Sequence, residues 1–280
     1  MTGVSPAVLA FVLVFAGLFG LVIGSFLNVV IYRVPAGIPL TRESRCPHCD
    51  EPVRPVENIP VVSWLVLRGR CAGCKAPISA RYPIVELATA LAFVGITWYF
   101  VATATLDSTG AVWSLVLTVA AFLYLASISI ALTLIDLDTH RLPNAIVLPA
   151  YAVGAVLLVA ASVLVGDLDA LVRAAIGMAA LYAFYFILRF VRPDGMGGGD
   201  VKLAGVLGLY LGWLGWGALV VGAFGAFLLG GIFGIGLLIT RRAGRKTAIP
   251  FGPWMILGAW VGVFGGESLS RWYLGLFITA

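Results

Sequence analysis

Two aspartates of this chain adjoin long apolar stretches, where acidic residues are rare. Asp136 directly follows the apolar stretch 112–135, and Asp200 closes the glycine-rich run 195–199 and precedes a further apolar stretch. A carboxylate at the centre of a bilayer costs about 2.5–3.5 kcal/mol on insertion scales, so acidic residues in membrane segments are usually functional. Two carboxylates that share one proton can activate a water molecule and protonate a peptide carbonyl oxygen. The pair therefore predicts an aspartic protease built into a membrane, with Asp136 and Asp200 as its catalytic residues.

The residues around this pair allow other interpretations of each aspartate alone. Asp200 precedes an apolar run and could cap a helix with Lys202 as its ion-pair partner, and Asp136 could form an interfacial ion pair. Asp138 is the rival of Asp136, but two helical positions place their side chains on nearly opposite faces, so only one can serve the site. We expect Asp138 and His140 to lie in a solvated turn.

The glycines before Asp200 have a physical use in such a site. Glycine leaves no side chain between backbone and substrate and tolerates positive φ, so an extended peptide could be held there by backbone hydrogen bonds. We therefore expect a flexible loop over 195–199, with substrate-supporting residues Gly197, Gly198, Gly199 and Lys202.

The composition is that of a membrane protein with many spans. The 280 residues are 61% hydrophobic and 11% charged, whereas soluble domains are about 45–50% apolar and about 25% charged. The net charge of +5 sets membrane orientation and does not indicate a nucleic-acid partner. Because a span needs about 20 apolar residues, we expect an all-α polytopic protein with about eight transmembrane helices. The expected spans lie near 7–32, 84–104, 112–135, 145–165, 170–190, 201–214, 216–240 and 250–266.

The distribution of lysine and arginine predicts the orientation of these spans. No cation precedes the first apolar stretch, which is too long for the core of a cleaved signal peptide. We expect it to be a retained helix that begins outside and ends in the cytoplasm. All lysines and arginines except Arg173 and Arg271 then fall in cytoplasmic segments. Two crossings separate Asp136 from Asp200, so both carboxylates return to the cytoplasmic face and can meet there.

All four cysteines lie in the polar segment 34–83. They form two CxxC pairs, and two such pairs can bind one zinc ion in a closed, structural thiolate shell. Two disulfides are the alternative, but the expected cytoplasmic side is reducing. Gly73 would permit the turn of the second pair, and no internal repeat is apparent in the chain. The expected zinc ligands are Cys46, Cys49, Cys71 and Cys74.

These patterns divide the chain into three parts and leave two rival functions. The parts are the first transmembrane helix over 1–33, a cytoplasmic four-cysteine zinc domain over 34–83 and a transmembrane aspartic peptidase domain over 84–280. An ion-coupled transporter could also use intramembrane aspartates, but we see no inverted repeat. A membrane scaffold with a zinc docking domain would leave Asp200 and its glycines without a role.

Four motifs together resemble the type IV prepilin peptidases, the membrane aspartic proteases with a GxGD motif. The motifs are GSFLNVVIYR at 24–33, the cysteine segment that ends in RYP at 81–83, Asp136 through Pro143-Asn144, and GGGD with Lys202-Leu203 at 197–203. PFGP at 250–253, preceded by Ile249, also fits. The resemblance covers essentially the whole chain.

The resemblance implies an activity, substrates and cofactors. Family members cut the basic leader from type IV prepilins or type II secretion pseudopilins after a glycine, on the cytoplasmic side of the bacterial inner membrane. The family's catalytic aspartates fall on Asp136 and Asp200. Members with the cysteine domain are typically multifunctional and also N-methylate the new N-terminal residue with S-adenosylmethionine. The methyltransferase residues are unassigned, with Glu86 as a speculative candidate, and membrane lipid is the remaining expected partner.

Overall fold

The computed structural model of this chain describes residues 5–240 and 250–278, and these residues are largely helical. Each expected span corresponds to one long helix, with boundary differences of a few residues at most ends. The exception is α9, which continues past 266 to Ile278. The elements are α1 (Pro6–Arg33), η1 (Pro55–Glu57), α2 (Val62–Val66), α3 (Arg81–Thr103), α4 (Thr109–Thr139), α5 (Asn144–Val165), α6 (Leu168–Val191), η2 (Pro193–Gly195), α7 (Gly198–Leu214), α8 (Trp216–Ile239) and α9 (Gly252–Ile278).

Six of these helices are long and apolar enough to cross a membrane by length and composition: α1, α3, α4, α5, α6 and α8. The 17-residue α7 and the longer α9 complete the eight helices at the expected spans. The expected cytoplasmic cations of 241–246, together with Ile249, lie outside the described residues.

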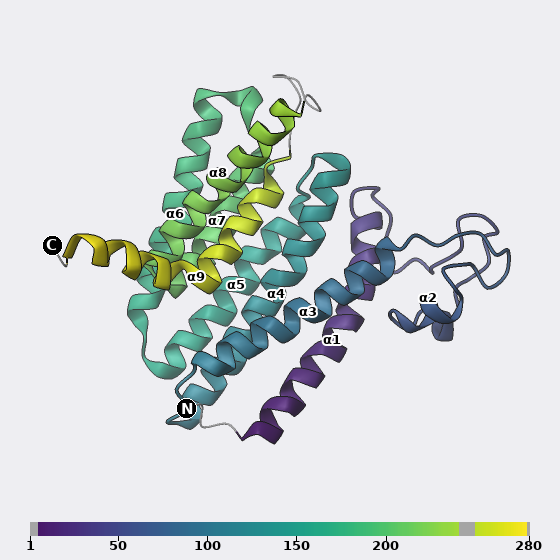
Figure 1. Ribbon diagram of the computed structural model, residues 1–280, viewed down its shortest axis with the longest axis horizontal. Helices are drawn as coiled ribbons and strands as arrows, with labels where there is room; N and C mark the ends of the chain where they lie inside the picture. Colours follow the sequence, from purple (N-terminus) through teal and green to yellow (C-terminus); the bar gives the residue numbers. More distant parts are fainter. Residues whose placement is uncertain (1–4, 241–249, 279–280) are drawn as a thin grey trace. The chain divides into compact units, whose positions relative to one another are not determined.

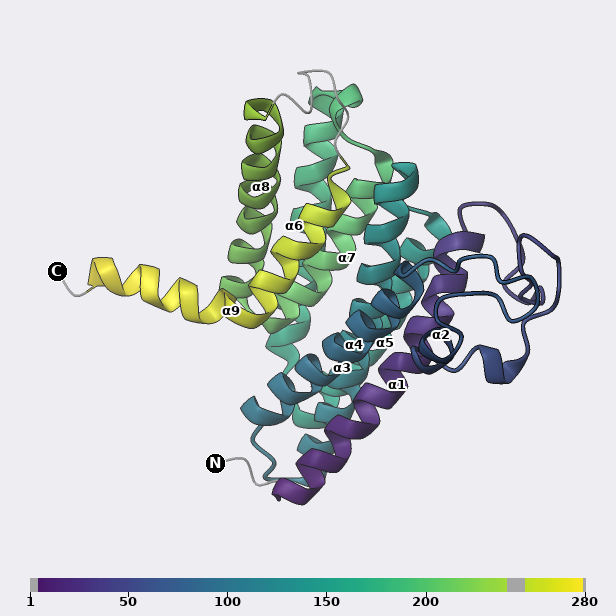
Figure 2. The ribbon, with the colours of Figure 1, turned by 45° about the vertical axis from the view of Figure 1, so that its right-hand side comes forward.

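The chain divides into two compact units. One comprises Met1–Ser108 with Phe122–Ala131, and the other comprises Thr109–Ala121 with Leu132–Ala280. In the first unit, α1 and α3 run side by side as an antiparallel pair (Figures 1 and 2).

Close backbone approach between α1 and α3 explains much of the GSFLNVVIYR motif. A Cβ atom at Gly24 would lie 2.7 Å from the Cα of Glu86, and one at Gly20 would lie 2.7 Å from the Cα of Ala90. One turn further along, the Asn28 side-chain amide donates to the Tyr82 carbonyl at 3.1 Å. Small residues permit close helix packing in a membrane, and polar side chains then bridge the helices.

The arginine that ends this motif organises the chain where it leaves α1. The side chain of Arg33 is buried and donates to the carbonyls of Leu40, at 2.9 Å, and Arg42, and to the Ser44 hydroxyl at 3.1 Å. An arginine with several acceptors can be buried without an ion pair because its donors are satisfied. Arg33 therefore fixes the path from α1 into the cysteine segment.

In the second unit, glycines line the contacts between α6 and α7 and between α8 and α9. A Cβ atom at Gly212 would lie 2.5 Å from the carbonyl oxygen of Arg173, and one at Gly208 would lie closer still to the carbonyl oxygen of Gly177. Gly258 and Gly262 contact the backbone of α8 around Gly222 in the same way. These GxxxG spacings bring helix backbones together without a hydrophobic driving force.

The α8–α9 contact predicts different effects for two glycine-to-alanine changes. A Cβ at Gly258 would lie 2.7 Å from the Gly222 carbonyl oxygen, whereas a Cβ at Gly231 on α8 meets no atom within 4 Å. We expect Gly258→Ala to destabilise the protein by about 1–3 kcal/mol, the usual range for overpacking. Gly231→Ala should leave stability unchanged or raise it. Thermal unfolding in detergent measures both, and equal melting temperatures would contradict this packing.

Candidate functional site

Asp136 lies in the last turns of α4 with its side chain turned into the protein. It is 5% exposed, next to the buried Ile135, whereas Asp138 is exposed. The backbone N–H of Gly252, at the start of α9, donates to Asp136 Oδ2 at 3.2 Å. A buried carboxylate needs such donors, so the start of α9 fixes the position of Asp136.

Asp200 lies in the first turn of α7, because this helix begins at Gly198. Its Oδ2 accepts a hydrogen bond of 2.9 Å from the backbone N–H of Gly197, the residue before the helix. The N-cap residue is Gly197 and not Asp200, but Asp200, three residues later, bonds back to it as in a capping box. A carboxylate in this turn is favoured by the positive end of the helix dipole.

Lys202 contacts α5 and is not the ion-pair partner considered for Asp200. Its Nζ donates to Asn144 Oδ1 at 2.9 Å, and its carbonyl accepts a hydrogen bond of 2.6 Å from the Tyr151 hydroxyl. Two bonds to one residue hold the start of α7 against the start of α5. Lys202 thus sets the position of the helix that carries Asp200.

The structure brings the two aspartates together. Leu142 contacts both Gly199, the neighbour of Asp200, and Gly252, whose N–H binds Asp136, although α5 and α6 separate the two aspartates in the chain. The side chain of Leu142 fills the space beside them, since Cβ atoms at Gly199 and Gly252 would lie 2.7 Å from its Cβ and 3.4 Å from its Cδ2. Two neighbouring carboxylates are suited to share a proton.

The glycines before Asp200 act through close contacts and not through positive φ. Gly198 and Gly199 lie inside α7, so the expected flexible loop over 195–199 is partly helical, and the three residues Gly197 to Gly199 have ordinary negative φ. Each approaches a different neighbour: Gly197 faces Asp200, Gly198 lies against the Arg189 guanidinium, and Gly199 packs on Leu142. Glycine at these positions therefore lets other side chains approach the start of α7.

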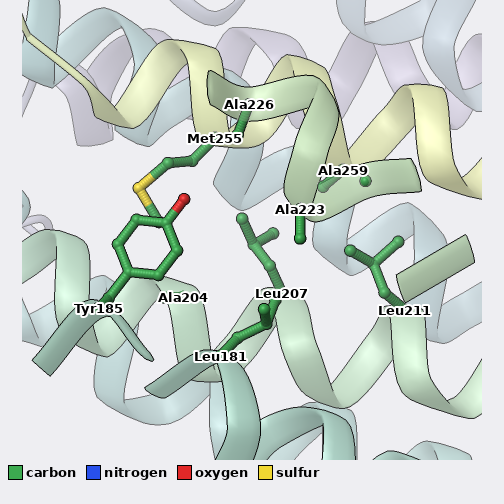
Figure 3. Close-up of a pocket in the computed structure, with 10 residues that line it drawn as sticks. Leu181, Tyr185, Ala204, Leu207, Leu211, Ala223, Ala226, Met255 and Ala259 are labelled. Atoms are coloured by element: carbon green, nitrogen blue, oxygen red, sulfur yellow. The ribbon is translucent and has the colours of Figure 1, made fainter. Parts of the chain in front are cut away.

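Tyr185 of α6 is a further residue beside this site. It is 2% exposed, interacts electrostatically with Asp200, and its ring lies 6.3 Å from that of Phe251. Tyr185 and Met255 line one side of an apolar pocket between α6, α7, α8 and α9, with Leu211 on the other side (Figure 3). Sequence reasoning noted the PFGP motif but missed Gly252 as a donor to Asp136, and it gave no indication of Leu142 or Tyr185.

The four cysteines converge in the first unit, as their spacing predicts. Their Sγ atoms all lie within 4.8 Å of one another, and those of Cys46 and Cys74 are 3.8 Å apart. Zinc–sulfur bonds of about 2.3 Å in a tetrahedron place two sulfurs about 3.8 Å apart. The backbone N–H groups of His48 and Cys49 lower the pKa of Cys46 to about 6, which favours the thiolate form that binds metal. Despite a hydrogen bond from the Glu51 backbone, burial and the neighbouring thiols raise the pKa of Cys49. The donor set fits zinc.

The two cysteine turns are copies of each other, so the expected absence of an internal repeat is wrong. The pattern RCxxCxxP occurs at 45–52 and again at 70–77. In each copy the arginine and the proline form an isolated antiparallel bridge, and the residue after the second cysteine, Asp50 or Lys75, has positive φ. Gly73 does not have positive φ, and its small size admits the Glu51 side chain instead.

Most acids of the cysteine segment already have cationic neighbours. Arg45 pairs with Glu43 at 3.0 Å and with Asp50 at 3.4 Å, and Arg54 pairs with Glu57. Hydrogen bonding to the Arg54 guanidinium lowers the pKa of Glu57. The two pairs of Arg45 are exposed, so they exchange readily for other partners, whereas the Glu57 side chain is largely covered.

Comparisons with known proteins agree along the chain. Residues 18–100 match the bacterial peptidase A24 N-terminal domain, and residues 123–235 match the type IV leader peptidase family. A prepilin leader peptidase/N-methyltransferase from Aeromonas hydrophila is 40% identical over 96% of both chains. Proteins of the same name from Pseudomonas aeruginosa and Neisseria gonorrhoeae are 37% and 36% identical over 92% of this chain and 91% and 93% of theirs. No solved structure gives a significant match.

The cysteine geometry predicts the metal content of the purified protein. Elemental analysis of the wild-type protein should give about one zinc ion per chain, since four thiolates form one closed shell. Cys46→Ser or Cys74→Ser should lose most of the metal. His48→Ala is the matched control, because His48 is exposed and lies between two ligands without belonging to the cluster. Equal loss of zinc in the His48 variant would contradict an all-thiolate site.

Proposed function

The chain belongs to the type IV leader peptidase family, and we propose that it is an intramembrane aspartic endopeptidase that removes the leader from type IV prepilins or pseudopilins. We also propose that it N-methylates the new N-terminal residue. The observation that carries the peptidase assignment is the convergence of Asp136 and Asp200 from α4 and α7. Relatives named for both activities, similar over nearly the whole chain, support it.

In this proposal the two aspartates hydrolyse the peptide bond as a pair. The ionised carboxylate takes a proton from water, and the resulting hydroxide adds to the scissile carbonyl carbon while the protonated carboxyl donates to the carbonyl oxygen. The C–N bond then breaks as the carboxyl that took the proton from water passes it to the leaving amine. A hydroxyl of the gem-diol intermediate returns its proton to the other carboxylate as the C=O bond re-forms, so the pair again holds one proton. The N–H groups of Gly252 and Gly197 hold the two carboxylates during these steps.

The site would face the cytoplasm, with the N-terminus of the chain outside. The support for this orientation is the cation bias, since Arg33, Arg81 and Arg189 all lie toward the ends of helices on the proposed cytoplasmic side. The basic leader would stay in the cytoplasm and the apolar stem of the substrate in the bilayer, with the cut after a glycine between them. Substrate would approach the start of α7, near Gly197, Gly198, Gly199 and Lys202.

The exposed acids of the cysteine segment would receive the basic leader. Glu43 and Asp50 are paired with Arg45 in exposed ion pairs. Glu57 is paired with Arg54 and largely covered, and Glu51 is a further exposed acid. Leader cations could replace Arg45 at little cost because exposed pairs contribute little stability. In the same proposal Cys46, Cys49, Cys71 and Cys74 bind a structural zinc ion that orders this segment.

The methylation would use S-adenosylmethionine, which supplies an electrophilic methyl group. The apolar pocket of Figure 3 does not fit this donor, because among its lining residues only Tyr185 offers a side-chain hydrogen-bonding group beyond sulfur. We therefore assign no residues to methyl-donor binding. Membrane lipid remains an expected partner, and nucleic acid does not enter the proposal.

One assay tests both activities. Purified protein in lipid, a prepilin-like substrate and S-adenosylmethionine should give a product cut after glycine and carrying one methyl group on its new N-terminus, as read by mass spectrometry. We expect Asp136→Asn and Asp200→Asn each to lower cleavage by at least about 10²–10⁴-fold, because each removes a proton-transfer group. Both variants should keep the wild-type melting temperature within a few degrees.

Asp138→Asn is the matched control for this assay. Its side chain is exposed on the same helix, so cleavage should remain close to wild type. Full cleavage by Asp136→Asn would transfer the assignment to Asp138. Cleavage without methylation would retain the peptidase and reject the methyltransferase. If the substrate is neither cleaved nor methylated, the transporter and the scaffold become the explanations again.

The close contact at Gly199 predicts a second, subtler effect on cleavage. A Cβ at Gly199 would lie 2.7 Å from the Cβ of Leu142, whereas one at Gly195 would lie no closer than 3.5 Å to Arg192. We expect Gly199→Ala to lower cleavage by about 10–100-fold, since small displacements of catalytic groups have effects of this size. Gly195→Ala should cleave normally in the same assay. Equal activities would show that the Leu142 contact does not position Asp200.

A further inference from the structure

The short helix α2, between the two cysteine turns, carries an unusual apolar surface. One side of the helix is fixed to the rest of the cysteine segment. There the Ser63 hydroxyl donates to the Val56 carbonyl at 2.9 Å, and the Trp64 indole donates to the Ile78 carbonyl at 3.1 Å. Contiguous apolar surface on a polar segment usually marks an interaction site. We define the α2 patch as the exposed side chains of Val56, Ile59, Val62, Leu65 and Val66.

A hydrogen bond fixes the height of α2 along α3. The backbone N–H of Val61, which precedes α2, donates to Glu86 Oε2 at 2.7 Å. Glu86 is buried and lies five residues after the start of α3 at Arg81, which is about 7.5 Å along the helix axis. Val61 has positive φ, an unusual state for a β-branched residue, so the contact holds the chain in a conformation that it would otherwise avoid.

At this height α3 already presents apolar side chains outward. Ile84, Leu87 and Leu91 are exposed on its surface, with Leu91 71% exposed. These residues belong to a helix that is long and apolar enough to cross a membrane. Exposed apolar residues on such a helix face lipid, so the bilayer reaches the turn that carries Glu86. The α2 patch, bound at the same turn, therefore lies at the depth of the membrane surface.

The charges beside α2 match an anionic membrane surface. Arg68 and Arg70 follow the helix directly and are both exposed. Apolar side chains next to arginine are typical of segments that lie in the headgroup layer, where cations attract anionic lipids. Leu65 and Val66 are 61% and 75% exposed, and insertion would remove this surface from water.

We propose that the α2 patch lies in the headgroup region of the bilayer that α1 and α3 cross, and that it holds the cysteine segment against the membrane. The occupant of the patch is the lipid surface itself. This proposal does not depend on the peptidase assignment, because it concerns only contacts within the first unit.

Site-specific photocrosslinking tests the proposal in the full-length protein. A genetically encoded diazirine amino acid would replace Leu65, and the protein would be reconstituted in vesicles of phosphatidylethanolamine and phosphatidylglycerol. Leu91 is the matched lipid-facing control and His48, exposed on the first cysteine turn, is the water-facing control. We expect the Leu65 probe to give lipid adducts at a yield close to that of Leu91 and several-fold above that of His48.

Two results would overturn the proposal. A lipid-adduct yield at Leu65 as low as that at His48 would place the patch in water. Adducts with a second copy of the chain would make it a protein interface. In a second arm, Arg68→Gln with Arg70→Gln should lower the Leu65 lipid yield in these vesicles and leave the Leu91 yield unchanged. Retained zinc in each probe-bearing protein would show that the cysteine segment is folded.

Discussion

The arrangement around Asp136 and Asp200 depends on one constraint, the need of a carboxylate in apolar surroundings for nearby hydrogen-bond donors. Asp136 is buried, so its donors must come from the protein, and the partly exposed Asp200 is held by a donor of the same kind. Asp136 receives the N–H of Gly252 at the start of α9, and Asp200 receives the N–H of Gly197 just before α7. Both donors are backbone groups at helix starts, where N–H groups lack partners within the helix. The C-terminal end of α4 must therefore lie close to the N-terminal ends of α7 and α9.

Small residues allow the helices to satisfy that constraint. Gly199 and Gly252 both contact Leu142, so a larger residue at either position would push apart the segments that carry the aspartates or their donors. Further from the site, Gly208 and Gly258 bring α6 to α7 and α8 to α9. Van der Waals packing is the main attraction between helices in lipid. Close backbone contact thus supplies the rigidity that the polar site requires.

The sequence predicted the helices and the convergence of the key residues, because both follow from local rules. Hydropathy located the spans, an even number of crossings predicted that Asp136 and Asp200 lie on one face, and CxxC spacing predicted the thiol cluster. The contacts of Gly252, Leu142 and Tyr185 were not predictable, since they join segments far apart in the chain. The glycines before Asp200 were recognised as special, but the expectation of positive φ is wrong, since their φ angles are ordinary and close neighbours require small residues there.

The hydrogen bond from Asn28 to the Tyr82 carbonyl has a consequence for how this protein can change during evolution. It joins α1 and α3 just before the chain leaves the helix pair at Arg33 and just after it returns at Arg81. The intervening residues therefore leave and re-enter the pair at one place. A segment attached in this way can be gained, lost or exchanged as a unit. Because the segment starts and ends at the same end of the helix pair, such an exchange would not change the direction in which any later helix crosses the membrane.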